Sequence, residues 1–332
     1  MYHKHLTNIL VILGGLLLLT SSFSNRAYAD EPYPAKPITM YIGSTVGGTV
    51  DLSVRALIAE AEKHLSQPFV PINNGGGGGA VPVGLVAKQR PDGYNLVGCA
   101  NAAYIRVPQF TRVTFKVEDL TPIATFLAAG GGIVVKADSP WKTLKDLVEY
   151  AKANPGKVKY AANGLGTAHQ MAMEYIAKQD SLKWTFVPYQ GSLPAVTAVL
   201  GGHVAAASVA PEFAPFVMDG KLRLLALTQG KKMKLFPDAP TLVELGYNYV
   251  NDTTFVVLGP RGTPQPIIKK LNQAFEKAVK SPDYVKTITL LQYDPMYMNA
   301  EETKAFLTKS YETIGKLIKE LKLPTEQSER KD

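Results

Sequence analysis

Short apolar runs alternate with longer segments of mixed polarity along almost the whole chain. Strands are predicted where four to six residues in a row are rich in β-branched or aromatic side chains. These runs are 38–42, 69–72, 95–99, 133–136, 158–161, 185–188, 204–209, 222–227 and 254–258. The segments between them carry apolar residues three and four positions apart, the spacing of a helix face. The alternation predicts an α/β architecture with mostly parallel sheets.

Two helices have clear ends in the sequence. Apolar residues recur at helical spacing over 144–151, and Asn154, Pro155 and Gly156 break the pattern. Near the C-terminus, Asn299 with Glu302 three residues on predicts an N-cap for a long apolar stripe. We expect that stripe to pack into the core rather than to bind a partner.

Two segments of the sequence indicate that the chain crosses between domains. The glycine cluster 130–132 lies between apolar runs, and an extended crossing is expected near 249–254. A mature chain of roughly 300 residues suits two domains. We therefore predict a discontinuous first domain, 30–131 plus 252–332, and an inserted second domain, 132–251.

The first 29 residues have the pattern of a cleaved leader. Lys4 precedes the apolar run 9–19, and Ala27-Tyr28-Ala29 has the small-x-small form that a signal peptidase needs. The run is too short to span a bilayer comfortably, which disfavours an uncleaved anchor. We expect an exported protein cut after Ala29.

Charge and cysteine content exclude some partners. Loss of Lys4 and Arg26 with the leader lowers the formal net charge by 2, from +8 to +6. The remaining basic residues are scattered rather than clustered with aromatics, so we expect no nucleic acid partner. The single Cys99 cannot form an internal disulfide, and we expect it to be buried at the end of a strand.

One local device recurs four times: a predicted strand delivers a small or polar loop to a helix N-terminus. The loops are 43–51, 75–79, 162–167 and 189–192. Glycines and helix N-termini present backbone N–H groups to an anion. Because ligands of open α/β sheets bind beyond the carboxyl ends of strands, the four loops are expected to face one cleft.

The second loop also fits the G-x-G-x-x-G/A pattern of dinucleotide sites. Gly75, Gly77 and Ala80 occupy its fixed positions. Asp92 comes too early to be the ribose ligand, and export disfavours a nicotinamide cofactor. We therefore expect no cofactor.

Motifs for catalysis are missing from the sequence. It contains no G-x-S-x-G, H-E-x-x-H, C-x-x-C or Walker A pattern. His64, His169 and His203 are too widely spaced to suggest a metal cluster, so no metal is expected. Donor loops without a nucleophile or a base predict a binding protein rather than an enzyme.

Ordered short motifs run from the start of the mature chain almost to its end. They include 33–38, Gly47-Gly48 with Asp51 and Arg55, 91–94, 154–156, Gly164 with Gly166, Thr167 and His169, 187–191, 201–202, 220–226, 237–246 and 262–264. Together they resemble the solute-binding receptors of tripartite tricarboxylate transporters, the Bug family.

The resemblance implies a periplasmic-binding-protein clamshell, type II-like, with two domains and a central ligand cleft. Such a protein closes on a small organic carboxylate, a di- or tricarboxylate or an aromatic acid, and delivers it to a membrane permease. It is periplasmic and not an enzyme, and we expect a monomer. Two competing interpretations are a receptor whose closed form is recognised by a membrane sensor and, less favoured, an exported hydrolase.

Matched to the family's loops, the ligand residues are Ser44, Thr45, Gly48, Gly78, Gly79, Gly166, Thr167 and His169. The fourth loop adds Tyr189, Gly191 and Ser192, and Asn101 follows a third strand. Pro211 and Glu212 are candidates for the cleft rim. Ser44, Thr45 and Val46 stand where the family usually has an aromatic residue and prolines, which favours an additional polar group on the ligand or more room.

Overall fold

A computed structural model describes residues 33–251 and 253–326. The chain divides into two compact units, 1–35 and 36–332, and every helix and strand named here belongs to the second. The leader and its cleavage point, predicted at 1–29, lie outside the described residues. The strands are β1 (Ile38–Ile42), β2 (Phe69–Asn73), β3 (Asn95–Ala100), β4 (Leu120–Ala128), β5 (Gly132–Lys136), β6 (Lys159–Ala162), β7 (Thr185–Pro188), β8 (Ala206–Val209), β9 (Leu222–Leu227), β10 (Thr254–Pro260) and β11 (Asp294–Met298).

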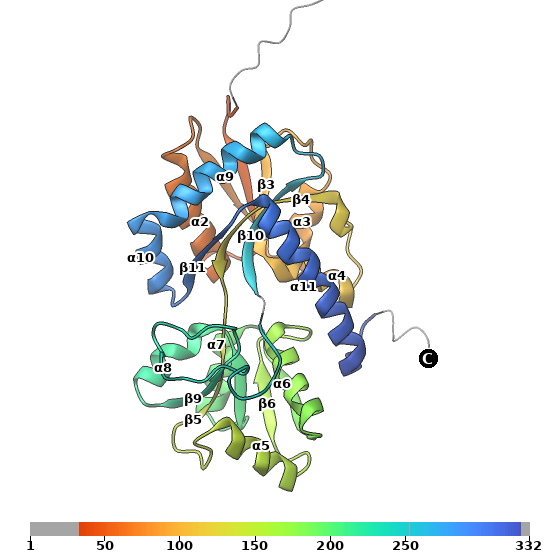
Figure 1. Cartoon of the computed structure of the whole chain (residues 1–332), viewed down its shortest axis with the longest axis vertical. Coiled ribbons are helices and arrows are strands. Elements are labelled where there is room, and N and C mark those ends of the chain that lie inside the picture. The colour runs from red at the N-terminus through yellow and green to blue at the C-terminus, as the bar shows by residue number, and fades with distance from the viewer. Residues whose placement is uncertain (1–32, 252, 327–332) are drawn as a thin grey trace, which may run out of the picture. The chain divides into compact units, whose positions relative to one another are not determined.

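Helices separate most of these strands (Figure 1). They are α2 (Thr49–Glu62), α3 (Ala80–Val86), α4 (Val107–Phe110), α5 (Leu144–Ala153), α6 (Ala168–Gln179), α7 (Ser192–Leu200), α8 (Ala214–Met218), α9 (Gln265–Lys280), α10 (Pro282–Leu290) and α11 (Ala300–Leu321). Shorter helical turns are η1 (Gly76–Gly79), η2 (Ala102–Arg106), η3 (Val117–Asp119) and η4 (Pro211–Phe213). The predicted α/β architecture is confirmed.

The strands form two sheets. The first has the order β11-β4-β10-β3-β1-β2, and the second has the order β7-β6-β8-β5-β9. We call each sheet with its flanking helices a lobe. Both faces of the first sheet are covered: Gly98 lies against Val54 of α2, whereas Cys99 belongs to the same buried cluster as Val83 of α3. Burial on both faces explains the long apolar runs of its central strands β3, β4 and β10.

Both sheets are mixed, where mostly parallel sheets were predicted. The strands β1, β2 and β3 are parallel, as are β6, β7 and β8, but β10 and β5 run antiparallel to their neighbours. Each of these two strands enters its sheet from the other lobe. It therefore starts at the edge where the neighbouring strands end. The alternation of strands and helices along the sequence does not indicate the direction in which a strand runs.

The chain leaves the first sheet after Ala128 and enters the second at Gly132. It rejoins the first sheet at Thr254. These are the two places where the sequence predicts crossings, and the domain boundaries at 131 and 252 stay a prediction. We call the region where the two sheets face each other, at the carboxyl ends of β1–β3 and β6–β8, the junction.

The predicted helix ends at 154 and 299 are confirmed. Helix α5 ends at Ala153 with Asn154 as its C-cap. Helix α11 begins after Asn299, whose side chain accepts hydrogen bonds from the amides of Glu301 and Glu302, while Glu302 completes the capping box. Such a cap contributes about 1 kcal/mol to a helix.

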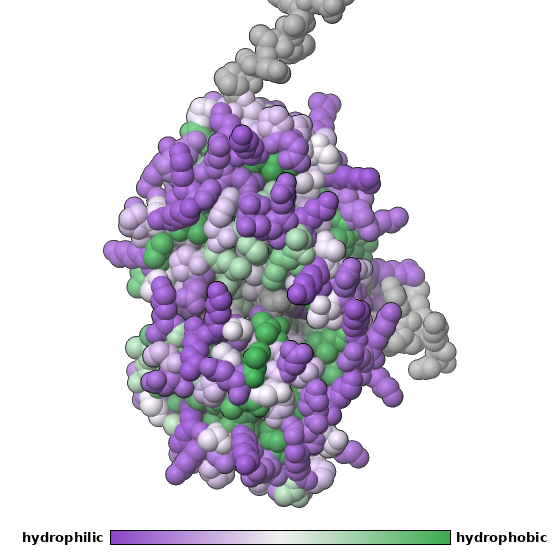
Figure 2. Space-filling model, viewed as in Figure 1, coloured by the Kyte–Doolittle hydropathy of each residue, from purple (hydrophilic) through white to green (hydrophobic). Residues whose placement is uncertain are grey.

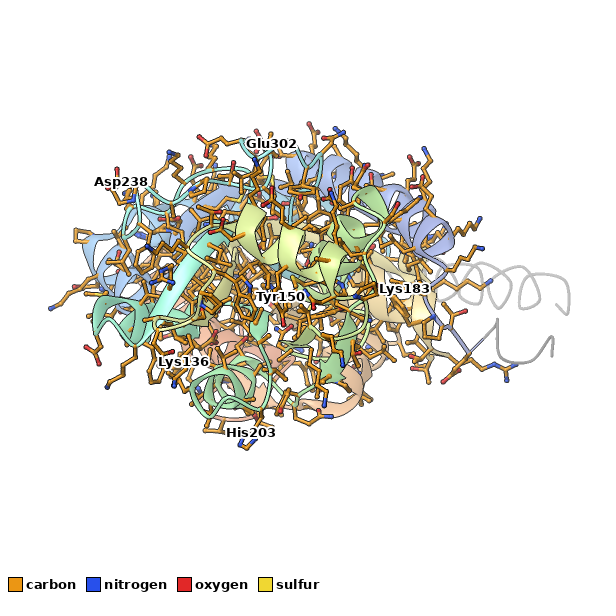
Figure 3. All side chains as sticks on the ribbon, turned by 90° about the horizontal axis from the view of Figure 1, so that it is seen from below. Lys136, Tyr150, Lys183, His203, Asp238 and Glu302 are labelled. Atoms are coloured by element: carbon orange, nitrogen blue, oxygen red, sulfur yellow. The ribbon has the colours of Figure 1, made fainter. Side chains whose placement is uncertain are left out.

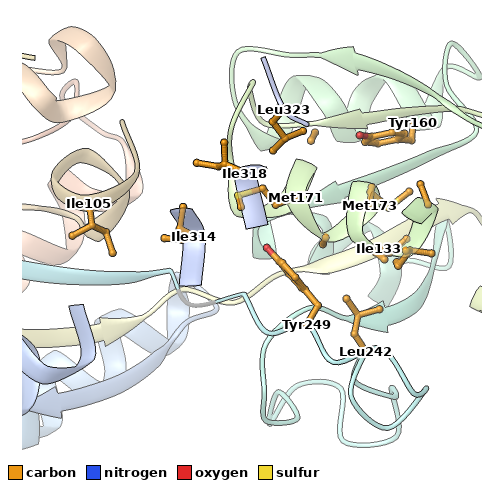
Figure 4. Packing of buried hydrophobic residues seen from close by; sticks show 14 of the residues in the cluster. Ile105, Ile133, Tyr160, Met171, Met173, Leu242, Tyr249, Ile314, Ile318 and Leu323 are labelled. Carbon is orange, nitrogen blue, oxygen red and sulfur yellow. The ribbon is translucent and has the colours of Figure 1, made fainter. Parts of the chain in front are cut away.

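Helix α11 reaches from one lobe to the other. At its start, the hydroxyls of Thr303 and Thr125 of β4 hydrogen bond at 3.1 Å in the first lobe. Farther along, Ile314 and Ile318 belong to a buried cluster that also contains Ile105 and Met171 of α6 (Figure 4). The predicted apolar stripe therefore packs against both lobes.

Hydrophilic side chains cover most of the face seen in Figure 2, where hydrophobic residues show in separate groups. Two of the histidines, His64 and His203, are exposed, and His203 projects from the rim of the view in Figure 3. Within the described ranges, no helix combines the length and the apolar character needed to cross a bilayer.

Candidate functional site

The predicted ligand loops gather at the junction. Loop one, Gly78 and Gly79, and Asn101 follow β1, β2 and β3, which are parallel neighbours. Loops three and four follow β6 and β7, which lie side by side with β8. Since carboxyl ends of parallel strands share one edge of a sheet, each lobe presents its loops along one edge.

Loop one is shaped by Asp51, which is buried in the first turn of α2. Its carboxylate accepts hydrogen bonds from the Gly47 amide at 2.8 Å, from Asn73 Nδ2 at 2.8 Å and from Arg55 Nε at 2.7 Å. Burial acts to raise the pKa of Asp51, but the bonds from Asn73, Gly47 and Arg55 outweigh it and leave that pKa below its usual value. Asp51 therefore holds the loop in place.

The predicted residues of loop one bond mainly within the loop. The Ser44 hydroxyl donates to the Thr45 carbonyl at 3.2 Å, and the Gly48 amide donates to the same carbonyl at 3.3 Å. Gly48 is the N-cap of α2 and makes no side-chain cap. The first amides of that helix, from Thr49 on, consequently point out of an uncapped positive end.

Loop two packs on loop one through glycines. Gly77, Gly78 and Gly79 have φ values of 60°, 64° and 90°, in the left-handed region that L side chains rarely adopt. A Cβ on Gly79 would lie 2.8 Å from the carbonyl oxygen of Gly43. The backbone conformation thus requires glycine at all three positions. At Gly79 the close approach of the Gly43 carbonyl requires it as well. Asn101, which follows β3, is fully buried.

Loop three is stabilised by side chains of its own helix. The Gly166 amide donates to Gln170 Oε1 at 2.6 Å. The Thr167 hydroxyl donates to the Gly164 carbonyl at 3.0 Å and accepts from the Gln170 amide at 3.3 Å. A hydroxyl has one hydrogen to donate. In this arrangement that hydrogen goes to Gly164, so Thr167 caps α6.

His169 lies at the crossing between the lobes. A Cβ on Gly131 would approach the His169 ring at 2.3 Å, and Asn251 Nδ2 lies 3.5 Å from His169 Nδ1. Burial, helped by the charge of Arg106, lowers the pKa of His169 to about 3. The ring is therefore neutral at physiological pH and touches both crossing segments.

Loop four leads into α7. Gly191 has a φ of 112° and precedes the helix as an N-cap without a side-chain cap. The Ser192 hydroxyl accepts a hydrogen bond from the Ala210 amide at 3.2 Å, and Tyr189 packs half-buried on the core of the second lobe. Ser192 thus ties the start of α7 to the segment that follows β8.

Two contacts join the lobes across the junction, and the sequence predicted neither. Thr49 Oγ1 donates to Glu212 Oε1 at 3.4 Å. A Cβ on Gly166 would lie 3.0 Å from the Phe110 ring. Pro211 and Glu212 were expected at the cleft rim, but Thr49 and Phe110 carry no motif that marks them. Only the fold brings these partners together.

Several buried polar atoms near the junction lack a hydrogen-bond partner within the described part of the chain. They are Asn163 Oδ1, Ser208 Oγ, Glu212 Oε2 and Thr254 Oγ1. Three of these residues lie at or just beyond the carboxyl ends of β6 and β8, and Thr254 begins β10. Buried polar groups are normally paired, so these atoms are candidates for hydrogen bonds to water or to a bound molecule.

Neither a metal cluster nor the cavity between α6 and α11 coincides with the predicted ligand residues in the described part of the chain. Over residues 33–251 and 253–326, no group of three or more His, Cys, Asp or Glu side chains is placed to hold a metal ion. A cavity of about 680 Å³ lies between α6 and α11, and none of the twelve predicted ligand residues lines it.

Comparison with known proteins identifies the family of this chain and supports its fold. The family model described as "Tripartite tricarboxylate transporter family receptor" matches residues 53–323. The "UPF0065 protein in gbd 5'region" of Cupriavidus necator is 37% identical over 303 residues, which cover 91% of this chain and 92% of the relative. "Protein BugT" of Bordetella pertussis is 30% identical over 321 residues, covering 95% and 98%.

Among solved structures, a TctC solute binding protein from Polaromonas aligns with a TM-score of 0.78 and 27% identity, covering 87% of this chain and 99% of that one. The matched residues span both lobes and every loop from loop two onward. The chain therefore belongs to the tripartite tricarboxylate transporter receptors, a family of solute-binding proteins that includes the Bug proteins.

Proposed function

We propose that this protein captures a small organic carboxylate in the periplasm by closing its two lobes, and delivers it to the membrane permease of a tripartite tricarboxylate transporter. Removal of the leader after Ala29 is part of this proposal. The ligand is a di- or tricarboxylate or an aromatic acid, held between the two sets of loops.

One observation carries the proposal: helices from both lobes start at the junction without side-chain caps. One is the short α3, after Gly79, and the longer ones are α2, after Gly48, and α7, after Gly191. Two hydrogen bonds and the short segment from Ala210 to Glu212 connect the starts of α2 and α7. The Ala210 amide donates to the Ser192 hydroxyl, and the Thr49 hydroxyl donates to Glu212. Two positive helix ends beside each other suit an anion.

The two lobes contribute differently to that site. Loop one and loop two are fixed by the Asp51 network and by close glycine packing, so the first lobe supplies the preformed anchor. The loops of the second lobe, with Gly166, Thr167, Gly191 and Ser192, close over the ligand. A carboxylate bound by backbone amides needs no arginine, because charge-assisted hydrogen bonds supply the stabilisation.

A thermal-shift screen tests the proposal. The mature protein is melted with succinate, citrate and phenylacetate, each beside its neutral amide. A ligand at about a hundredfold over its Kd adds roughly 2.7 kcal/mol to the free energy of unfolding, which raises Tm visibly. No shift with any acid contradicts the carboxylate proposal, and chemical turnover of a bound acid contradicts transport.

A matched pair of substitutions tests the α2 anchor. Thr49→Pro removes the first amide of the helix, where proline is tolerated, and Gly48 already has the extended backbone that precedes proline, with φ −71° and ψ 161°. Thr49→Val removes only the hydroxyl. We expect the proline variant to bind the acid about tenfold more weakly than the valine variant, the worth of one hydrogen bond to a charge. Equal affinities would exclude the Thr49 amide from the site.

A further inference from the structure

Glu212 is placed unusually for an acidic residue in a receptor for acids. It lies in η4, directly after β8, at the same edge of the sheet as loops three and four. The Thr49 hydroxyl reaches its Oε1 from the opposite lobe at 3.4 Å. The carboxylate is therefore at the junction, beside the uncapped start of α2.

The second carboxylate oxygen of Glu212 is buried without a partner. Oε2 accepts no hydrogen bond from any residue that the structure describes, and no lysine or arginine among those residues pairs with the side chain. Within the described ranges, the side chain accepts a hydrogen bond from Thr49, at the long end of hydrogen-bonding distance. A buried carboxylate oxygen without a donor costs free energy unless the ligand supplies one.

The neighbours of Glu212 do not supply that donor. Ser192 uses its hydroxyl to accept from the Ala210 amide on the same segment. Tyr293 lies nearby on the first lobe; burial raises the pKa of its phenol, and the charge of Glu212 adds to the rise. The phenol therefore stays protonated, but it makes no hydrogen bond to Glu212 Oε2 in the described structure. Glu212 Oε2 is left without a donor from these neighbours.

We propose that Glu212 selects ligands that carry a hydrogen-bond donor, an ammonium or a hydroxyl group, next to the carboxylate. This inference rests on the proposed function, because it assigns Glu212 to the same site. The helix N-termini hold the carboxylate of the ligand, and Glu212 Oε2 accepts from its donor. The wall of small hydroxyl residues in loop one, Ser44 and Thr45, leaves room for such a substituent.

The test compares acids that differ only at one position. Succinate, malate and aspartate form one series, and phenylacetate, mandelate and phenylglycine form another; in each the hydrogen is replaced by a hydroxyl and then by an ammonium. Calorimetric titration of the whole mature protein gives Kd for each. We expect the hydroxy or amino member of the bound series to bind at least tenfold more tightly than the plain acid.

The variant Glu212→Gln then isolates the side chain. It should weaken the hydroxy or amino acid about tenfold and change the Kd of the plain acid less than twofold. Asp219→Asn is the matched control, because Asp219 is an exposed acid just after α8 that pairs with Lys221 at 3.2 Å; it should change neither Kd. Melting without ligand confirms that both variants are folded.

Other outcomes separate the two proposals. Plain, hydroxy and amino acids that bind equally in the wild type would overturn the role of Glu212 and leave carboxylate capture intact. An equal gain for all acids in Glu212→Gln would also overturn it, since the side chain would then only repel anions. Failure of every acid in both series and in the wider screen would overturn the proposed function itself.

Discussion

The two lobes hold their junction loops by different means. In the first lobe, loop one is fixed by a charged side chain, Asp51, which bonds to a loop amide and to side chains of α2 and β2. In the second, loop three is fixed by neutral groups of α6, Thr167 and Gln170. The first arrangement leaves the helix end uncapped, whereas the second caps it.

This difference shows which of the two loops, loop one or loop three, is prepared for an anion. A capped helix has already given its first amides to a side chain, while an uncapped one keeps them for a ligand. Asp51 does not occupy the amide donors at the start of α2, because its carboxylate accepts a hydrogen bond from the Gly47 amide of the loop rather than from the helix amides. We therefore expect changes in the first lobe to affect anion binding more than equal changes in loop three.

The largest effect is expected at Gly79. In Gly79→Ala, the left-handed φ costs about 1–2 kcal/mol, and overlap with the Gly43 carbonyl brings the total to about 3 kcal/mol. Gly77→Ala is the matched control, since its φ is 60° but no heavy atom lies closer than 3.5 Å to the added Cβ. It should lose only the conformational part. Urea unfolding measures both, and equal losses would show that loop two moves aside freely.

Asp51→Asn should come next, with a loss of about 2 kcal/mol, because one orientation of the amide or the other turns an NH₂ towards a donor. The folded pKa of Asp51 is depressed. Its contribution is therefore complete above the unfolded pKa of about 3.9 and is lost as pH falls through the folded value. Urea unfolding at a series of pH values should show the gap to wild type closing below about pH 4.

Asp138→Asn is the control for that experiment. Asp138 is exposed and pairs with Lys136 at 3.1 Å, so its loss should cost less than about 0.5 kcal/mol at any pH. A pH-independent gap for Asp51→Asn would contradict the charged network.

A smaller effect is expected in loop three. Thr167→Ala removes the α6 cap and should cost about 1 kcal/mol of stability, while Thr167→Ser keeps it. Thr143→Ala removes a similar cap from α5, outside the junction. Similar losses of stability with unchanged affinity in both alanine variants would support the capping role. A tenfold loss of acid affinity in Thr167→Ala alone would instead show that the hydroxyl leaves Gly164 to bind the ligand.

The smallest effect is expected where the lobes touch at their exposed surface. Lys178 of α6 pairs with Glu320 of α11 at 3.2 Å, and both side chains are about half exposed. Lys178→Ala should cost no more than about 0.5 kcal/mol, less in 1 M salt. Lys145→Ala, in the pair with Glu149, gives the baseline for one exposed pair within a lobe. A loss above about 1.5 kcal/mol would show that this pair couples the lobes.

Local chemistry explains what the sequence predicted well. The cap at Asn299 and the breaks at Asn154 and at the crossings depend on residues a few positions apart. The strands β4 and β11 were missed: β4 runs to nine residues without alternation, and β11 is intermediate in burial throughout. Neither has the short, bounded apolar run on which the prediction relied.

The site itself depends on distances that no local pattern encodes. Thr49 and Glu212 are 163 residues apart in sequence. His169 was predicted to approach the ligand from its glycine turn, yet its ring packs on Gly131, since the crossing strand passes over the start of α6. Strand and glycine patterns predicted where the loops lie. The roles of the side chains depend on how the two lobes come together, which these patterns do not encode. The ligand contacts of all twelve residues stay a prediction.

Cys99 gives these experiments a practical advantage. The only cysteine of the chain is fully buried, with its Cβ side against Gly43, and burial raises the pKa of its thiol to about 12. Since the thiolate is the reactive form, maleimide dyes will leave the native protein unmodified. Cysteines introduced at two exposed positions, one in each lobe, can therefore be labelled selectively, and energy transfer between the dyes will report lobe closure as acid is added.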